Sequence, residues 1–124
     1  MKINNVVVIG SGTMGGGIAA QLCNANIPVT LLDLKTEISK KARDIIFNSR
    51  PPLLLDKSKI NNIKVGNISD DFGTVKKADW IVEAVVEKID IKRNLYKKIF
   101  NERKKESIVS SNTSSIPIKV LAQN

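Results

Sequence analysis

The sequence of 124 residues contains no histidine. Its absence excludes, within this chain, a metal site built on histidine, a serine–histidine–aspartate triad and a histidine general base. No metal site is expected. Cys23 is the only cysteine, so no disulfide can close within the chain, and a reducing, cytoplasmic setting is expected.

Long apolar runs and aromatic residues are also scarce. No stretch approaches the ~18 apolar residues of a membrane span, and Asn4 and Asn5 interrupt the apolar core that a signal peptide needs. The net charge of +8 suggests an anionic partner. Aromatic residues make up only 4% of the sequence, which disfavours a nucleic-acid-binding surface. We therefore expect no nucleic acid and no membrane partner, and favour a phosphorylated small molecule.

Apolar periodicity predicts that strands and helices alternate along the chain. The expected strands are short runs at 6–9, 29–32, 63–65, 80–86 and 107–110. The expected helices cover 14–24, 36–48, 89–100 and 116–121. This alternation predicts one α/β domain over residues 1–124, with a doubly wound parallel sheet.

Local features refine these elements. Asn26 is expected in a left-handed conformation after the first helix, and Thr36 is expected to cap the second. The first helix is rich in glycine and alanine and should be packed on nearly all sides, with Cys23 as a small core residue. Met14 is expected to pack beside a bound cofactor. The apolar face of the second helix should consist of Ile38, Ala42, Ile45 and Ile46.

A glycine-rich segment follows the first expected strand. Residues 10–15, Gly-Ser-Gly-Thr-Met-Gly, match the pattern G-x-G-x-x-G. Gly10 permits the tight turn, Gly12 lets a pyrophosphate approach the backbone, and Gly15 lets the helix pack close to the strand. Asp33 ends the second strand, where a carboxylate can accept both hydroxyls of an adenosine ribose and repel a 2′-phosphate. The context predicts a Rossmann-type site that favours NAD over NADP; a structural glycine turn is the alternative.

Two further polar segments stand at strand ends. They are 83–87, Glu-Ala-Val-Val-Glu, and 111–116, Ser-Asn-Thr-Ser-Ser-Ile. Read alone, they are also compatible with a helix-start acid and an ordinary N-cap. Together with the loop at 10–15 and Asp33, they resemble the NAD-binding domain of the 3-hydroxyacyl-CoA dehydrogenases. The resemblance covers the chain except for a poor match at 47–72.

The resemblance implies roles for particular residues. The implied cofactor-binding residues are Gly10, Gly12, Thr13, Met14, Gly15, Asp33, Glu87, Lys92 and Asn112. Ser114 is the implied active-site serine, which hydrogen-bonds the 3-hydroxyl or 3-keto oxygen of the substrate. The implied activity interconverts an (S)-3-hydroxyacyl-CoA and a 3-oxoacyl-CoA by hydride transfer to NAD.

The family's catalytic histidine, the glutamate that orients it and the helical substrate domain have no counterpart in this sequence. We therefore expect a fragment, truncated before the sixth strand: a shortened chain, a proteolytic piece, or the product of a split or decayed gene. It should bind NAD(H) without turnover and self-associate through its exposed sheet edge. The alternatives are a stand-alone, non-catalytic, crystallin-like NAD-binding protein and a fragment of a related NAD-dependent hydroxyacid dehydrogenase.

Overall fold

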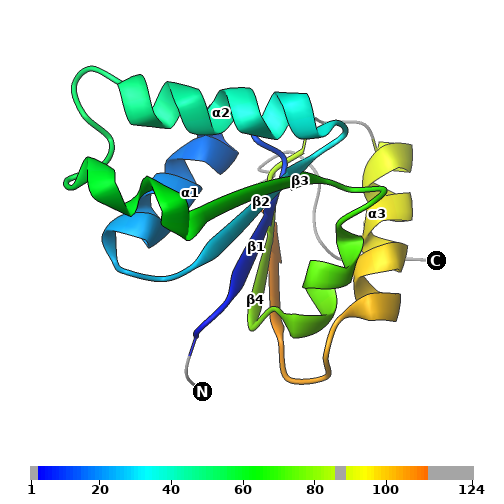
Figure 1. Ribbon diagram of the computed structural model, residues 1–124. Helices are drawn as coiled ribbons and strands as arrows, with labels where there is room; N and C mark the ends of the chain where they lie inside the picture. Colours follow the sequence, from blue (N-terminus) through cyan, green and yellow to red (C-terminus); the bar gives the residue numbers. More distant parts are fainter. Residues whose placement is uncertain (1–2, 86–88, 112–124) are drawn as a thin grey trace.

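The computed structural model describes residues 3–85 and 89–111, apart from the side chains at 89–92. Its centre is a parallel five-stranded sheet (Figure 1). The strands are β1 (Val6–Ile9), β2 (Val29–Asp33), β3 (Ile63–Asn67), β4 (Trp80–Glu83) and β5 (Ile108–Ser111). The helices are α1 (Thr13–Asn24), α2 (Thr36–Asn48) and α3 (Ile89–Glu102), with the 3₁₀ helices η1 (Lys57–Asn62) and η2 (Phe72–Lys77). The expected α/β Rossmann-type sheet is confirmed.

The strand order is β3-β2-β1-β4-β5, so the direction of winding reverses at β1. Val6, at the start of β1, pairs with Val29 and Trp80. Ile9, at its end, pairs with Leu32 and Glu83. The carboxyl ends of the central strands therefore meet at one edge of the sheet, where ligands bind in open α/β folds.

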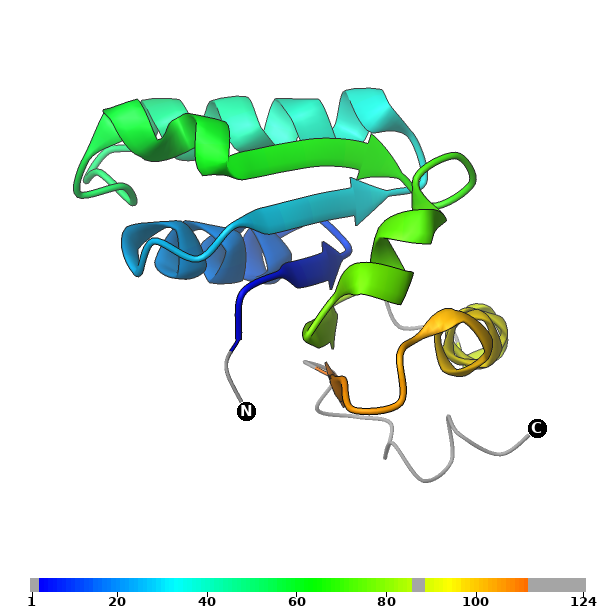
Figure 2. The same cartoon turned by 60° about the horizontal axis from the view of Figure 1, so that its bottom comes forward.

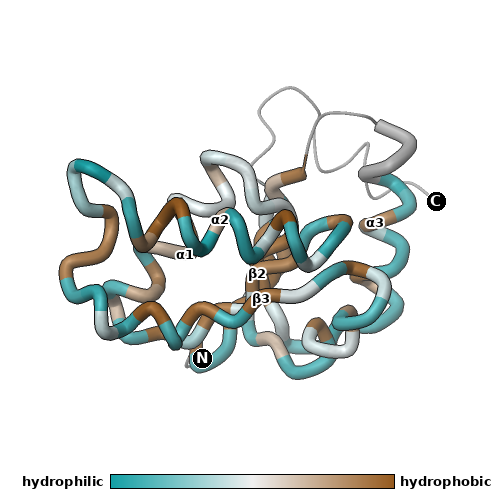
Figure 3. The backbone as a smooth tube through the Cα atoms, turned by 45° about the horizontal axis from the view of Figure 1, so that its top comes forward, coloured by the Kyte–Doolittle hydropathy of each residue, from teal (hydrophilic) through white to brown (hydrophobic). Residues whose placement is uncertain are grey.

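Helices cover both faces of the sheet because β1 is apolar at every position. Val6 and Val8 belong to a cluster with residues of α1, α2 and η1, whereas Val7 and Ile9 belong to a second cluster with residues of α3 and η2. Figure 2 shows α3 on the other side of the sheet from α1 and α2. Figure 3 shows the hydrophobic colour gathered along the strands between these layers. Burial of each large aliphatic side chain contributes about 1.5–3 kcal/mol, so these two clusters hold the layers together.

Several expectations about the elements are met and others are wrong. Asn26 has the expected left-handed conformation, with a φ of 63°. The second helix has the expected bounds, but Lys35 rather than Thr36 occupies its cap position, and no side chain caps it. The fourth strand ends at Glu83 and not at residue 86, and the amide of Val85 donates to the Glu83 carboxylate instead of continuing the strand.

Two expected packing surfaces are also corrected. Ile38 and Ile45 are 43% and 60% exposed, and the buried positions of α2 are Ser39, Ala42 and Ile46. Met14 is 58% exposed, so the first helix has an open outer face. Cys23 is fully buried, as expected. The expected helix at 116–121 lies outside the described residues.

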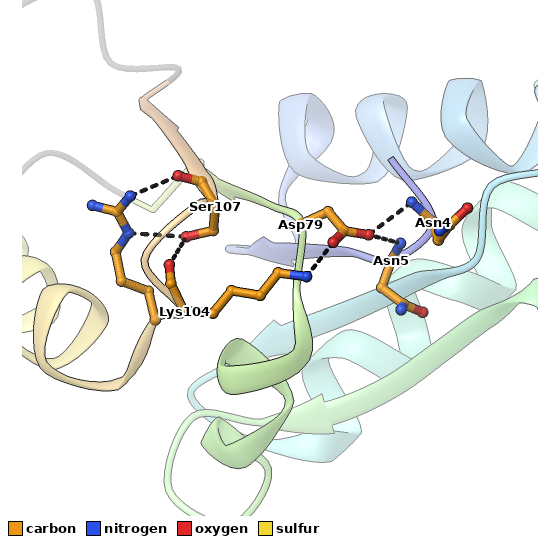
Figure 4. A network of polar contacts seen from close by, with 6 residues as sticks. Asn4, Asn5, Asp79, Lys104 and Ser107 are labelled. Atoms are coloured by element: carbon orange, nitrogen blue, oxygen red, sulfur yellow. Dashed lines mark hydrogen bonds and ion pairs between the residues drawn. The ribbon is translucent and has the colours of Figure 1, made fainter. Parts of the chain in front are cut away.

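A polar network ties the amino ends of the strands together (Figure 4). One oxygen of the buried Asp79 accepts hydrogen bonds from the amides of Asn4 at 2.8 Å and Asn5 at 3.0 Å. The other oxygen forms an ion pair with Lys104, in the connection between α3 and β5. Chiefly the hydrogen bond from Lys104, and also the two amides, lower the pKa of Asp79 from 3.8 to about 2. This carboxylate therefore links the segment before β1 to the chain on both sides of α3.

Among residues 3–85 and 89–111, no helix is long and apolar enough to cross a membrane. No group of three or more histidine, cysteine, aspartate or glutamate side chains is placed to hold a metal ion in that same part of the chain.

Candidate functional site

The loop after β1 is built around Gly10, which has a positive φ. Gly10 has a φ of 104°, a left-handed conformation that favours glycine. Its amide donates to the carbonyl of Leu32 at 2.8 Å, which holds the turn against β2. A Cβ atom at this position would lie 2.5 Å from the carbonyl oxygen of Ala84. Both the conformation and the neighbouring backbone therefore require glycine here.

The other two glycines of the loop meet different surroundings. A Cβ atom on Gly15 would lie 1.8 Å from the carbonyl oxygen of Gly10, so the first turn of α1 packs directly on the loop. Gly12 has no atom within 4 Å of the corresponding position, so its backbone is open to a ligand. No side chain caps the start of α1. The amides at the beginning of a helix can therefore receive an anion there.

Asp33 lies against this loop. One of its carboxylate oxygens accepts hydrogen bonds from the amide and the hydroxyl of Ser11, at 2.8 and 2.5 Å. The second oxygen accepts from the amide of Leu34 at 2.7 Å. These bonds fix the carboxylate at the end of β2, beside the glycine loop. Ser11 was not predicted as a site residue, although its place between Gly10 and Gly12 indicated that it lies in the loop.

A cavity of about 430 Å³ opens beside Asp33 and the loop. It is lined by Gly10, Ser11, Gly12, Asp33, Leu34, Ile38, Ile68, Ala84, Val85, Asn94, Leu95 and Lys98. The lining combines the backbone of the loop and the Asp33 carboxylate with mainly aliphatic side chains. The volume lies in the range of small-molecule sites. Such a cavity can accept a flat, apolar ring while Asp33 binds hydroxyl groups beside it.

Ile38 and Lys98 are cavity residues that the sequence analysis did not identify. The exposure of Ile38, which contradicts its expected packing role, places its side chain at the cavity wall. Lys98 also places its ammonium nitrogen 4.9 Å from the ring centroid of Phe72. A helical stripe drawn from sequence alone does not distinguish the residues that face a core from those that face a ligand cavity.

The structure brings only some of the expected site residues together. Gly10, Gly12 and Asp33 line the same cavity. Thr13 and Met14 line a separate groove of about 420 Å³ on the outer face of α1, together with Trp80. Three expected site residues, Glu87, Asn112 and Ser114, lie outside the described residues. Lys92 belongs to α3, but its side chain is likewise not described.

Glu83 forms a second polar centre at the carboxyl edge. Its side chain is fully buried. One carboxylate oxygen accepts from the hydroxyl of Ser111 at 2.7 Å and from that of Tyr96 at 3.3 Å. The other accepts from the amide of Val85 at 2.7 Å. Burial, together with the nearby negative charge of Glu83, raises the pKa of Tyr96 to about 12, so this hydroxyl stays protonated and donates.

Comparison with known proteins gives a consistent family. The family model described as "3-hydroxyacyl-CoA dehydrogenase, NAD binding domain" matches residues 5–124. A probable 3-hydroxyacyl-CoA dehydrogenase of Deinococcus radiodurans is 42% identical over 125 residues, which cover 95% of this chain and 36% of the relative. A putative fatty acid oxidation complex trifunctional enzyme of Rickettsia felis is 39% identical over 130 residues, which cover 99% of this chain and 18% of that protein.

Comparison of the fold with solved structures agrees with the comparison of sequences. The crystal structure of 3-hydroxybutyryl-CoA dehydrogenase from Escherichia coli K12 matches with a TM-score of 0.85 and 29% identity, covering 98% of this chain and 27% of that one. The chain therefore spans between about a fifth and about a third of the length of these relatives.

Proposed function

The chain belongs to the 3-hydroxyacyl-CoA dehydrogenase family as its NAD-binding domain, and we propose that it binds NAD along the carboxyl edge of the sheet. The observation that carries this proposal is the position of Asp33, fixed by Ser11 beside the glycine loop and facing the cavity. The dinucleotide is the phosphorylated small molecule that the basic composition suggests.

The residues fit this cofactor from the adenosine end onward. The Asp33 carboxylate would accept hydrogen bonds from the adenosine ribose hydroxyls, and the aliphatic walls at Leu34 and Ile68 would hold the adenine. The open backbone at Gly12 and the uncapped start of α1 would receive the pyrophosphate. A 2′-phosphate would meet the negative charge of Asp33, which favours NAD over NADP.

We further propose that the chain serves an enzyme that interconverts (S)-3-hydroxyacyl-CoA and 3-oxoacyl-CoA. Bound NAD would supply a hydride acceptor for C3 of the substrate. Glu87, Lys92 and Asn112 are proposed to contact the cofactor, and Ser114 to donate a hydrogen bond to the substrate oxygen. This chain has no histidine to act as general base, so the proton acceptor must come from other residues.

The first test is a titration of the purified chain with NADH and, separately, with NADPH. Energy transfer from Trp80, the only tryptophan, reports the bound nicotinamide without requiring Trp80 to touch it. Saturable binding that prefers NADH supports the proposal. Absence of binding to both, in this assay and in calorimetry, would contradict it.

The second test concerns turnover. Removal of a positioned general base lowers a rate by about 10²–10⁴-fold, so the chain alone should not detectably reduce acetoacetyl-CoA with NADH. Adding or fusing the carboxyl-terminal part of the Deinococcus radiodurans relative should restore this activity. A chain that binds NADH but gains no activity with that part is instead a non-catalytic NAD-binding protein.

Self-association is a separate proposal. β5 is an outer strand of the sheet within the described residues, and Ile108 on it is 48% exposed. An exposed strand can pair with another chain through its backbone groups. We expect dimers in sedimentation at high concentration, and a strictly monomeric profile would contradict this.

A further inference from the structure

Glu83 is a fully buried acid at the carboxyl edge of the sheet, next to the proposed cofactor site. We propose that Glu83 is a positioning residue for the nicotinamide half of the cofactor. It acts by holding the chain segments that leave β4 and β5. This inference rests on the proposed function, because it concerns the second half of the same dinucleotide site.

The position of Glu83 in the sheet places it beyond the adenosine half. Asp33 ends β2, the glycine loop follows β1, and the order of strands continues through β4 to β5. A dinucleotide crosses a doubly wound sheet at the point where the strand order reverses. With the adenosine ribose at Asp33 and the pyrophosphate at the loop, the remaining half extends over β4 and β5.

The contacts of Glu83 join the segments that would surround this half. The Glu83 carboxylate accepts a hydrogen bond at 2.7 Å from the amide of Val85, in the segment that leaves β4. Ser111, whose hydroxyl it accepts at 2.7 Å, is the last residue of β5. Tyr96 adds a contact from α3 at 3.3 Å. One carboxylate therefore fixes two strand exits relative to the helix that packs beneath them.

The segment after β4 also lies close to the glycine loop. The amide of Ala84 donates to the carbonyl of Ile9 at 2.7 Å, and the carbonyl of Ala84 is the atom nearest a Cβ on Gly10. A change at Glu83 would therefore reach the loop that receives the pyrophosphate indirectly, through the backbone of Ala84. Its direct effect would fall on the exits of β4 and β5.

Burying a carboxylate is less favourable in free energy than burying an aliphatic side chain. Transfer of a charged group out of water is strongly unfavourable unless hydrogen bonds compensate it. Ile81, two residues earlier in β4 and on the same face of the sheet, is fully buried, so an aliphatic residue suffices to fill a neighbouring position on this face. The hydrogen bonds of Glu83 therefore serve the geometry of the strand exits.

The test compares two ligands on one variant, Glu83→Gln, which keeps the shape and one acceptor oxygen. NADH contains both halves of the cofactor, whereas ADP contains only the adenosine and pyrophosphate. Calorimetry of Glu83→Gln should show about tenfold weaker binding of NADH, and a change of less than about twofold for ADP. A residue that only stabilises the fold would weaken both ligands equally.

The matched control is Asp79→Asn at the opposite end of β4, which should leave both affinities within about twofold of the original chain. Tyr96→Phe provides a second, milder variant should Glu83→Gln not fold, and it should lower NADH affinity in the same direction by a smaller factor. Unchanged NADH affinity in these variants, or equal losses for NADH and ADP, would overturn the inference. Failure of the original chain to bind NADH would instead overturn the proposed function, and this inference with it.

Discussion

The two ends of β4 each carry a buried acid, and the two acids have different surroundings. Asp79 precedes the strand at the amino edge and is held by the amides of Asn4 and Asn5 and by Lys104. Glu83 ends the strand at the carboxyl edge, where a backbone amide and two hydroxyls donate to it. We call the contacts of Asp79 with Asn4, Asn5 and Lys104 the Asp79 clamp. Glu83, in contrast, directly precedes two residues that line the cavity.

The amino ends of the strands therefore contribute mainly to the stability of the fold, and the carboxyl ends mainly to ligand binding. The Asp79 clamp joins segments 75 residues apart in sequence, so its main effect is to close the fold. Arg103 reinforces the same end by donating to the hydroxyl and carbonyl of Ser107. The carboxyl edge, in contrast, contains the glycine loop, Asp33 and the cavity. We expect substitutions at the amino edge to change stability and those at the carboxyl edge to change cofactor affinity.

The largest effect should come from the glycine loop, where Gly15 lies at the carboxyl end of the strands but is needed for stable folding. Gly15→Ala puts a Cβ atom 1.8 Å from the Gly10 carbonyl oxygen, and we expect a cost on the order of 4 kcal/mol or more, enough to prevent stable folding. Gly12→Ala meets no atom within 4 Å and has a φ of −68° that alanine adopts readily. It should fold normally and bind NADH about tenfold more weakly.

Circular dichroism and NADH titration distinguish these two outcomes. A Gly15→Ala chain with a normal melting curve would contradict the packing of α1 on the loop. A Gly12→Ala chain with unchanged NADH affinity would contradict the proposed place of the pyrophosphate.

The next largest effect should follow from Asp33→Ala. Loss of hydrogen bonds to the ribose hydroxyls should weaken NADH binding by roughly 10–100-fold. NADPH should be affected less, because the repulsion of its 2′-phosphate is removed at the same time. The fluorescence titration with both cofactors measures this change. Asp70→Ala, at an exposed loop position, is the control and should leave both affinities unchanged. A constant preference for NADH in Asp33→Ala would argue against this role.

The contribution of Asp79 to stability should depend on pH. The folded-state pKa of Asp79, about 2, lies below its ordinary value of 3.8, so folding favours the charged form. Its contribution is therefore present above the ordinary pKa and is lost as pH falls through the folded value. Asp79→Asn should lower the free energy of unfolding at neutral pH, and its deficit should shrink as the pH falls from 3.8 toward about 2.

Urea unfolding of both chains across this pH range gives the difference directly. A deficit that stays constant down to the lowest pH would show that the charge of Asp79 does not contribute. A large loss of NADH affinity in Asp79→Asn at neutral pH would show that the amino ends of the strands also contribute to cofactor binding.

The smallest effect should be found at an exposed ion pair. Lys76 and Glu102 lie 3.1 Å apart, with side chains 64% and 33% exposed. Exposed pairs contribute little, so Glu102→Gln should change the free energy of unfolding by less than about 1 kcal/mol. NADH affinity should stay the same. If matched urea curves show a change as large as that of Asp79→Asn, the exposed pair contributes as much to stability as the buried one, which contradicts this expectation.

The sequence predicted what local chemistry determines. The alternation of apolar runs predicted the parallel sheet, and the glycine pattern with Asp33 predicted a dinucleotide site, whose residues Gly10, Gly12 and Asp33 line one cavity. Asn26 was predictable because asparagine tolerates a left-handed conformation. These features depend on residues close together in the chain or on a spacing with one physical explanation.

The remaining features depend on long-range contacts. The end of β4 was predicted too late because the amide of Val85 bonds to the Glu83 carboxylate, a contact that an apolar pattern does not reveal. Ile38 was predicted in the core because helical spacing does not show that the neighbouring surface is a cavity. The Asp79 clamp joins Asn4 to Lys104 across most of the chain, and no local signal indicates it. The roles of Glu87, Lys92, Asn112 and Ser114 stay predictions.

The most direct test of the separation between edges is a titration of ¹⁵N-labelled chain with NAD⁺, followed by amide chemical shifts. We expect saturable shifts at the glycine loop and at residues 33–34 and 84–85. The amides of Asn4, Asn5 and Asp79 should keep their shifts. Shifts concentrated at the amino edge, or no saturable shift at the glycine loop, would contradict this expectation.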